Sequence, residues 1–149
     1  MCIRDRDKIG VSGTSAGGHL AASVGTLSPQ RPSFMILFYP VISADTDKRH
    51  RGSFEQLLGK KHCDTPQSQE LSLEKKVDVQ TPPTLLFHCD DDKVVPAVNS
   101  VLFYKQLKTY GIKSSLHIYP SGGHGWGMSS CFRYYDDWQK SVLDWLSTL

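Results

Sequence analysis

The chain alternates short apolar runs with longer stretches in which apolar residues recur every three or four positions. Runs typical of buried strands lie at residues 9–11, 34–39, 84–88 and 116–119. Helical spacing begins at Ala16, at about Ala97 and at Phe132. Because strands that alternate with helices pair in parallel, this order predicts an α/β domain with at least four parallel strands and helices on both faces.

The connection between the second and third predicted strands is long and polar. Residues 43–80 contain short helical patterns such as "SFEQLL", which Gly59 closes. This crossover replaces a single helix. We therefore expect it to form a lid-like insertion or a cap that contacts the substrate.

The first six residues, "MCIRDR", fit neither a strand nor a helix pattern. They also lack the apolar core of a signal peptide, so the sequence leaves the localisation open. We expect residues 1–6 to be a non-native start and residues 7–149 to be the C-terminal part of one domain.

Composition narrows the function classes. Seventeen Lys and Arg against fifteen Asp and Glu give a near-neutral chain, and the one basic cluster, at residues 48–51, has the pattern of a solvated loop. This pattern argues against a nucleic-acid partner. No apolar run has the length of a membrane span, which argues against a membrane partner.

The four cysteines are isolated along the chain, so free thiols are expected rather than a disulfide framework. His62 with Cys63, and His88 with Cys89, lack the spacing that lets two side chains face one metal ion. We therefore expect neither a metal nor a cofactor.

The stretch "KIGVSGTSAGGHLAAS", residues 8–23, places Ser15 at the junction of the first predicted strand and helix. Gly13 and Gly17 flank this serine in the pattern G-x-S-x-G, which is typical of a nucleophile elbow. In such an elbow, small residues let the strand and helix backbones approach closely. A plain glycine-rich turn is the alternative, and the five residues alone do not separate the two interpretations.

Two later motifs favour a nucleophile. The segment "PPTLLFHCDDDKVVP" places three aspartates, Asp90 to Asp92, after the third strand, and "SSLHIYPSGGHGWG" places His124 on a glycine-rich loop after the fourth. The order serine, aspartate, histidine is that of the α/β-hydrolases. Each motif follows a strand, at the edge of the sheet where ligands of such folds bind.

From Asp7 to the C-terminus the chain resembles the last part of bacterial α/β-hydrolases of the acetyl-esterase and acetylxylan-esterase-like group. The matching segments are "DKIGVSGTSAGGHLAAS", "TPPTLLFHCDDDKVVPAVNSVLFYKQLKTYGI" and "LHIYPSGGHGWG", which together cover most of the chain. The resemblance implies a partial α/β-hydrolase fold. It also implies a serine carboxylester hydrolase, commonly one that removes acyl groups from plant polysaccharides.

In such an enzyme Ser15 would attack the ester carbonyl, His124 would act as the base, and an aspartate would orient the imidazole. The D-x-x-V-P pattern of the resembling group selects Asp92, with Asp91 as the next candidate. Because crowded carboxylates repel one another, Asp90 or Asp91 is expected to be solvated or bonded to loop amides. The backbone amide of Ala16 is the oxyanion donor identifiable in this chain.

Other candidate residues have ordinary structural explanations. His19 lies one helical turn after Ser15 and could resemble the base, but its place on the apolar helix face indicates a packed residue. His117 alternates with apolar neighbours on a strand, so a structural role is expected. Trp126 could form a wall of the substrate pocket or cover the sheet edge, and the sequence favours neither.

The chain departs from the resembling group because no glycine-rich HGGG-type loop precedes Ser15. That loop supplies an oxyanion donor, so we expect feeble hydrolysis and self-association through an exposed sheet edge. A peptidase of the prolyl-oligopeptidase type shares the residue order, although Ala16 after the nucleophile favours an esterase. A non-catalytic fragment or binding module that retains the motif is the remaining alternative.

Overall fold

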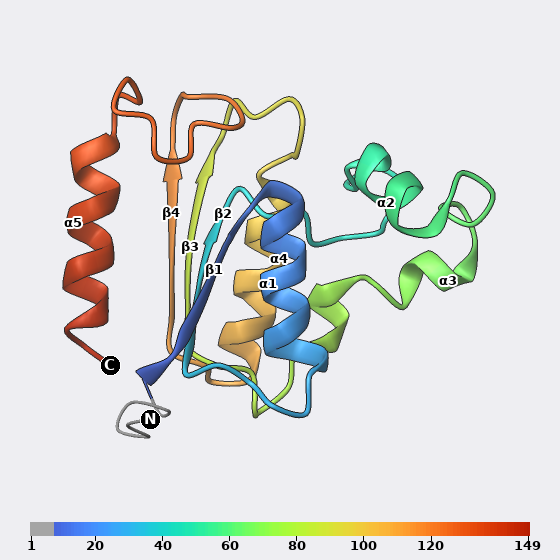
Figure 1. Cartoon of the computed structure of the whole chain (residues 1–149), viewed down its shortest axis with the longest axis horizontal. Coiled ribbons are helices and arrows are strands. Elements are labelled where there is room, and N and C mark those ends of the chain that lie inside the picture. Colours follow the sequence, from blue (N-terminus) through green and yellow to red (C-terminus); the bar gives the residue numbers. More distant parts are fainter. Residues whose placement is uncertain (1–7) are drawn as a thin grey trace, which may run out of the picture.

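The computed structural model of the chain describes residues 8–149, so the suspected non-native start and Cys2 lie outside the described residues. Four strands form one parallel sheet in the order β1 (Gly10–Thr14), β2 (Phe34–Phe38), β3 (Thr84–Cys89) and β4 (Ser114–Tyr119) (Figure 1). The strand order in space equals the order in the sequence. This sheet confirms the predicted parallel α/β architecture.

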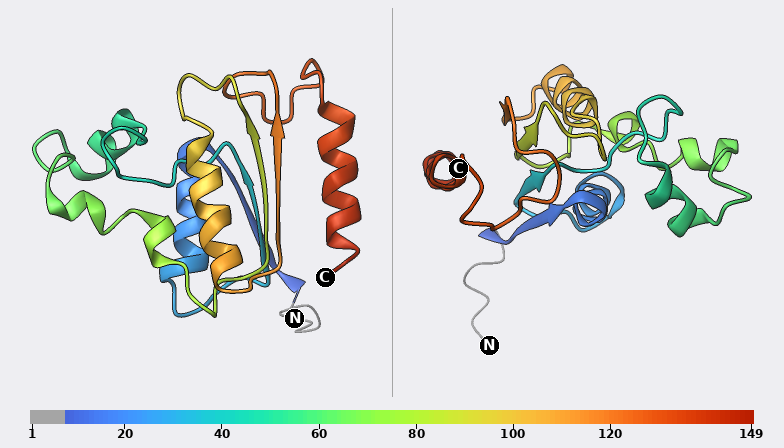
Figure 2. Two further views of the ribbon diagram at one scale, coloured as in Figure 1. Left: turned by 180° about the vertical axis from the view of Figure 1, so that it is seen from behind. Right: turned by 90° about the horizontal axis from the view of Figure 1, so that it is seen from above.

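Helices cover both faces of the sheet, as the alternation of patterns predicts. Helices α1 (Ser15–Leu27) and α4 (Val98–Thr109), with the 3₁₀ turn η2 (Leu73–Lys76), lie on one face, and α5 (Tyr135–Leu146) lies on the other (Figures 1 and 2). None of the helices in residues 8–149 is both long and apolar enough to cross a membrane.

The two central strands are buried on both faces, which explains their unbroken apolar sequences. On the face toward α5, Phe38 and Phe87 stack on each other, and Trp138 of α5 packs edge-on against Phe38. On the opposite face, Met35, Leu37 and Leu86 of the strands pack against α1 and against Phe103 and Leu107 of α4. Hydrophobic burial on both faces therefore fixes the carboxyl ends of the strands relative to one another.

The long crossover forms an arm that extends away from the sheet, beyond α1 and α4 (Figures 1 and 2). It contains α2 (Arg51–Leu58) and α3 (Pro66–Gln69), and α2 ends at Gly59, whose φ of 80° requires the conformational freedom of glycine. A small cluster, which includes Phe54 and Cys63, connects the arm to Val41 and Val95. The predicted lid role of this insertion stays a prediction.

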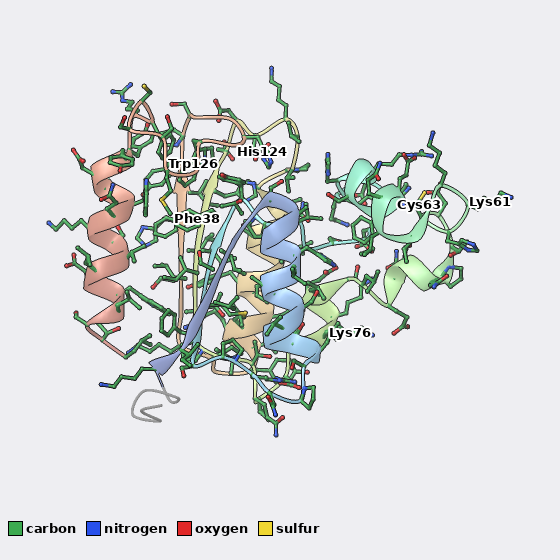
Figure 3. All side chains as sticks on the ribbon, viewed as in Figure 1. Phe38, Lys61, Cys63, Lys76, His124 and Trp126 are labelled. Atoms are coloured by element: carbon green, nitrogen blue, oxygen red, sulfur yellow. The ribbon has the colours of Figure 1, made fainter. Side chains whose placement is uncertain are left out.

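Among the described residues, β1 pairs with β2 alone and is therefore an edge strand of the sheet. The junction of β1 with α1 and the loops that follow β3 and β4 meet at the carboxyl edge of the sheet, where His124 lies (Figure 3). The parallel topology thus gathers the sequence motifs that are far apart along the chain.

Candidate active site

Ser15 is the first residue of α1 and directly follows β1. Its φ of 53° lies in the left-handed region, and Tyr39 is the other described non-glycine residue with a positive φ. Such a conformation costs of order 1–3 kcal/mol and persists where the surroundings enforce it. The serine therefore occupies the strained strand-to-helix turn that the G-x-S-x-G pattern predicts.

Gly13 and Gly18 allow the backbones to approach closely at this turn, whereas the sequence pattern pairs Gly13 with Gly17. A β-carbon on Gly13 would lie 2.2 Å from the carbonyl oxygen of Gly17, and one on Gly18 would lie 2.7 Å from the Pro40 β-carbon. A β-carbon on Gly17 itself would meet no atom within 4 Å. The predicted need for a small residue is therefore correct at Gly13 but not at Gly17, and the second close contact is made at Gly18, which lies outside the pattern.

Ser15, His124 and Asp92 form one chain of hydrogen bonds. Ser15 Oγ lies 2.8 Å from His124 Nε2, and His124 Nδ1 lies 2.6 Å from Asp92 Oδ2. A carboxylate accepts but does not donate, so Nδ1 carries the proton and Nε2 accepts the hydroxyl of Ser15. This arrangement leaves Nε2 ready to take the serine proton.

Asp92 is buried and bound on both of its oxygens. Oδ1 accepts the backbone amides of Val94 and Val95, each at 2.9 Å, while Oδ2 faces His124. Charge-assisted bonds of this kind stabilise a carboxylate that has been removed from water. Of the three competing aspartates, Asp92 is the one that contacts His124.

Asp91 and Asp90 lie apart from the imidazole. Asp91 accepts the backbone amides of Gly122 and Gly123, at 3.2 and 2.8 Å, and these bonds lower the pKa of its carboxyl. This is the loop-amide arrangement expected for one of the two remaining aspartates. The side chain of Asp90 is exposed.

The buried imidazole of His88 contacts the loop that carries Asp92, and no sequence signal indicated this contact. Its Nδ1 lies 2.7 Å from the Ser100 hydroxyl, and its Nε2 lies 2.9 Å from the Val95 carbonyl and 3.4 Å from Asp92 Oδ2. Burial lowers the pKa of His88, so the imidazole is neutral and donates to the carbonyl. In the sequence, the pair His88 and Cys89 lacks the spacing of a metal site, and no other local signal indicates a role for His88.

Tyr39 is a second feature that no sequence signal indicated. It follows β2 with a φ of 37°, and its ring packs edge-on against the His124 imidazole at a centroid distance of 4.7 Å. Burial raises the pKa of its hydroxyl. A strained, buried aromatic residue therefore limits the positions that the His124 ring can adopt.

Trp126 belongs to an aromatic cluster on the α5 side of the sheet (Figure 3). Its ring stacks on Phe132 at 4.1 Å and packs edge-on against Phe38 and Tyr39. The ring is therefore part of the core on this side of the sheet, and a role for Trp126 in a substrate pocket stays a prediction.

His19 does not contact Ser15. Its Nδ1 donates to the Val41 carbonyl at 3.1 Å, its ring packs edge-on against Phe54, and burial lowers its pKa. These contacts match the packed residue that its helical position predicts. His117 stacks on Phe87 from β4, which agrees with the expected structural role.

Ala16 is the second residue of α1, in the first helical turn, where backbone amides have no partner within the helix. It also lies at one end of an apolar groove of about 720 Å³ between α1 and α2. Leu20, Leu27 and Leu57 line this groove and are 68%, 48% and 58% exposed. Because it has no partner within the helix, the Ala16 amide is available beside Ser15, as an oxyanion donor requires.

Known proteins resemble this chain over nearly its whole length. The sequence model of the prolyl oligopeptidase family matches residues 3–149. An acetylxylan esterase from Xylanibacter ruminicola is 39% identical over 146 residues, which are 95% of this chain and 30% of that protein.

Solved structures add two relatives. A crystal structure of an acetyl ester-xyloside bifunctional hydrolase from Caldicellulosiruptor lactoaceticus is 40% identical with a TM-score of 0.87, and the match covers 95% of this chain and 57% of that one. A sugar hydrolase from Lactococcus lactis is 29% identical with a TM-score of 0.79, and the match covers 96% and 59%. The chain thus spans less than two thirds of the length of each of these relatives.

These findings confirm the resemblance to acetyl esterases and acetylxylan esterases and the α/β-hydrolase type of fold. The family match extends from residue 3 to the last residue and includes the loops that carry Ser15, Asp92 and His124. The chain belongs to the prolyl oligopeptidase family of α/β-hydrolases.

Proposed function

We propose that this chain carries the catalytic triad of a serine ester hydrolase, with Ser15 as nucleophile, His124 as general base and Asp92 as the orienting acid. The hydrogen-bond chain from Ser15 through His124 to Asp92 carries the proposal. A serine hydroxyl is a weak nucleophile without an adjacent base, and this geometry supplies one.

The proposed reaction passes through an acyl-enzyme. Ser15 Oγ attacks the ester carbonyl while Nε2 of His124 takes the hydroxyl proton, and the Ala16 amide stabilises the negative oxygen of the tetrahedral intermediate. His124 then returns the proton to the departing alcohol. A water molecule then attacks the acyl-enzyme while His124 takes its proton, and the carboxylic acid is released from Ser15. Asp92 keeps the proton on Nδ1 and stabilises the imidazolium.

We propose an acetylated carbohydrate as the substrate class. Support comes from the names of two relatives, an acetylxylan esterase and an acetyl ester-xyloside hydrolase, which are 39% and 40% identical to this chain. A peptidase activity is the second candidate, because the family match bears the name of prolyl oligopeptidase. Hydrolysis rates of p-nitrophenyl acetate and of a prolyl amide distinguish the two.

The activity and association of this chain alone are further parts of the proposal. Among the described residues, the Ala16 amide is the oxyanion donor that the proposal identifies, and we expect weak hydrolysis with this donor alone. A missing donor costs about 10²–10³ in turnover. Among the described residues β1 pairs on one side only, and this edge together with the exposed leucines of the groove favours self-association.

Fusing a family-like segment upstream of β1 tests both statements. Turnover should rise by roughly 10²–10³ and size-exclusion chromatography should change from concentration-dependent oligomers to a monomer. Equal turnover and a monomeric short chain would contradict this part of the proposal.

Covalent labelling by a fluorophosphonate tests the triad itself, because it requires an activated serine and no knowledge of the substrate. Ser15→Ala should abolish labelling and esterase activity without changing the fold. Ser23→Ala is the matched control, since Ser23 lies on the same helix and its hydroxyl donates to the His19 carbonyl at 2.8 Å. Full labelling of Ser15→Ala, or loss of labelling only in Ser23→Ala, would refute the proposed nucleophile.

A further inference from the structure

The loop that carries His124 is rich in glycines held at positive φ. Gly122, Gly123, Gly125 and Gly127 have φ values of 142°, 62°, 80° and 42°. Glycine loses more conformational freedom on ordering than any other residue, so a loop of this composition does not fix its own shape. Contacts from outside the loop must therefore hold His124 in place.

The carboxylate of Asp91 binds the backbone of this loop. Its Oδ1 accepts the amide of Gly123 at 2.8 Å, and its Oδ2 accepts the amide of Gly122 at 3.2 Å. Within the described part of the chain, these are the hydrogen bonds donated by backbone amides between residues 121 and 125. The carboxylate thus binds two successive amides immediately before His124.

Close packing around Gly122 also restricts the backbone of the His124 loop. A β-carbon on Gly122 would lie 2.8 Å from Cys89 Sγ and 2.4 Å from the Phe132 ring. The neighbouring loop is anchored to the end of β4, because the Asp90 amide donates to the Tyr119 carbonyl at 2.8 Å. Gly122 is thus exposed to solvent on one side and packs closely against Cys89 and Phe132 on the other, next to the exposed Asp91 carboxylate.

Asp91 and Asp92 are consecutive residues that hold the same loop at two different points. Asp92 binds the imidazole of His124, and Asp91 binds the backbone one and two residues before it. We propose that Asp91 is a positioning residue, which sets the backbone of the His124 loop so that Nε2 reaches Ser15 Oγ. This inference rests on the proposed function and adds a residue that acts through His124.

Replacement of Asp91 by Asn tests the inference, with Asp90→Asn as the matched control. An amide side chain offers one acceptor oxygen in place of two charged ones, so one loop amide loses its partner. Asp90 lies on the same loop and is exposed, as Asp91 is, but its side chain makes no hydrogen bond within residues 8–149, so its replacement removes the same charge without removing a contact. Asp91→Asn should lower kcat for p-nitrophenyl acetate and the fluorophosphonate labelling rate roughly tenfold, with KM unchanged.

A second background separates positioning from general loss of structure. In His124→Ala, the further change Asp91→Asn should leave the residual labelling rate within about twofold, because residues that act as a unit are not additive. If the wild-type chain is labelled and the labelling rates of Asp91→Asn and Asp90→Asn are equal, the inference is overturned and the proposed function stands. So would a tenfold loss that persists in the His124→Ala background. Absence of labelling in the wild-type chain would instead overturn the proposed function and this inference with it.

Discussion

Asp92 binds His124 with one carboxylate oxygen and the backbone of its own loop with the other. Oδ2 lies 2.6 Å from Nδ1 of His124, and Oδ1 accepts the amides of Val94 and Val95 at 2.9 Å each. The two amides fix the rotation of the carboxylate, so the atom that faces the imidazole is determined by the fold of the loop.

Asp92→Asn should therefore almost abolish turnover while the fold persists. The asparagine oxygen would keep the two loop amides, which turns its NH₂ group toward Nδ1 of His124. Nδ1 would then accept a hydrogen bond, and Nε2 would carry the proton and could no longer take one from Ser15. The wrong tautomer costs about 10⁴ in kcat in a Ser-His-Asp triad of similar geometry on another fold. Steady-state assays and the labelling rate measure this loss.

Asp91→Asn is the comparison for this variant. The proposed roles require a loss of kcat in Asp92→Asn that exceeds the loss in Asp91→Asn by orders of magnitude. If Asp91→Asn were the more damaging of the two, the acid would have been assigned to the wrong aspartate.

Local sequence patterns predicted the parallel α/β fold correctly, since strand and helix periodicities depend on neighbouring residues. The strands that precede Ser15, Asp92 and His124 follow from their apolar runs, and parallel pairing then brings their carboxyl ends together. The choice of Asp92 over Asp91 required the D-x-x-V-P resemblance, because three consecutive carboxylates have equal local signals.

Features that depend on tertiary contacts were not predictable. A positive φ at Tyr39 leaves no trace in the sequence, because a tyrosine in a strained turn looks like any aromatic residue at the end of a strand. The support of Asp92 by His88 depends on the fold of the loop between β3 and α4. The open space at Gly17 depends on what packs against α1.

His19 and His124 should respond differently to truncation. His124→Ala removes the proposed base and should reduce labelling to a small residual rate, with little change in Tm. His19→Ala removes a buried ring that packs on Phe54 and a bond to the Val41 carbonyl, so it should lower stability by about 2–4 kcal/mol. Thermal melting and labelling rates are measured on both variants. Unchanged melting with lost activity in His19→Ala would reverse the two roles.

Gly17→Ala and Gly18→Ala form a matched pair of adjacent helix positions. A methyl group at Gly18 would lie 2.7 Å from the Pro40 β-carbon and 2.9 Å from its α-carbon, so the backbone must shift, at a cost of roughly 1–3 kcal/mol. At Gly17 the space is open, and alanine should stabilise the helix by about 0.5–1 kcal/mol. Urea unfolding of both variants measures the difference. Equal stabilities would contradict the close contact between α1 and the loop after β2.

The ion pair between Arg31 and Asp78 should add an acid-dependent contribution to stability. Arg31 binds the carboxylate with both terminal nitrogens, and the second of these bonds measures 2.8 Å, so the pKa of Asp78 falls from 3.8 to about 2. Since the folded pKa is lower than the unfolded pKa, the contribution is complete above pH 4 and disappears as the pH falls toward 2. The Asp78 side chain is 43% exposed, so solvent screening limits the contribution to about 1 kcal/mol or less. Replacing Asp78 by Asn tests this contribution. Asp78→Asn should lower the free energy of unfolding by this amount at pH 7, and the difference from wild type should shrink between pH 4 and pH 2. Asp47→Asn is the control, because Asp47 is 77% exposed and its contact with Lys48 should contribute little at any pH. A constant difference between wild type and Asp78→Asn across this range would show that the loss comes from packing rather than from the charge.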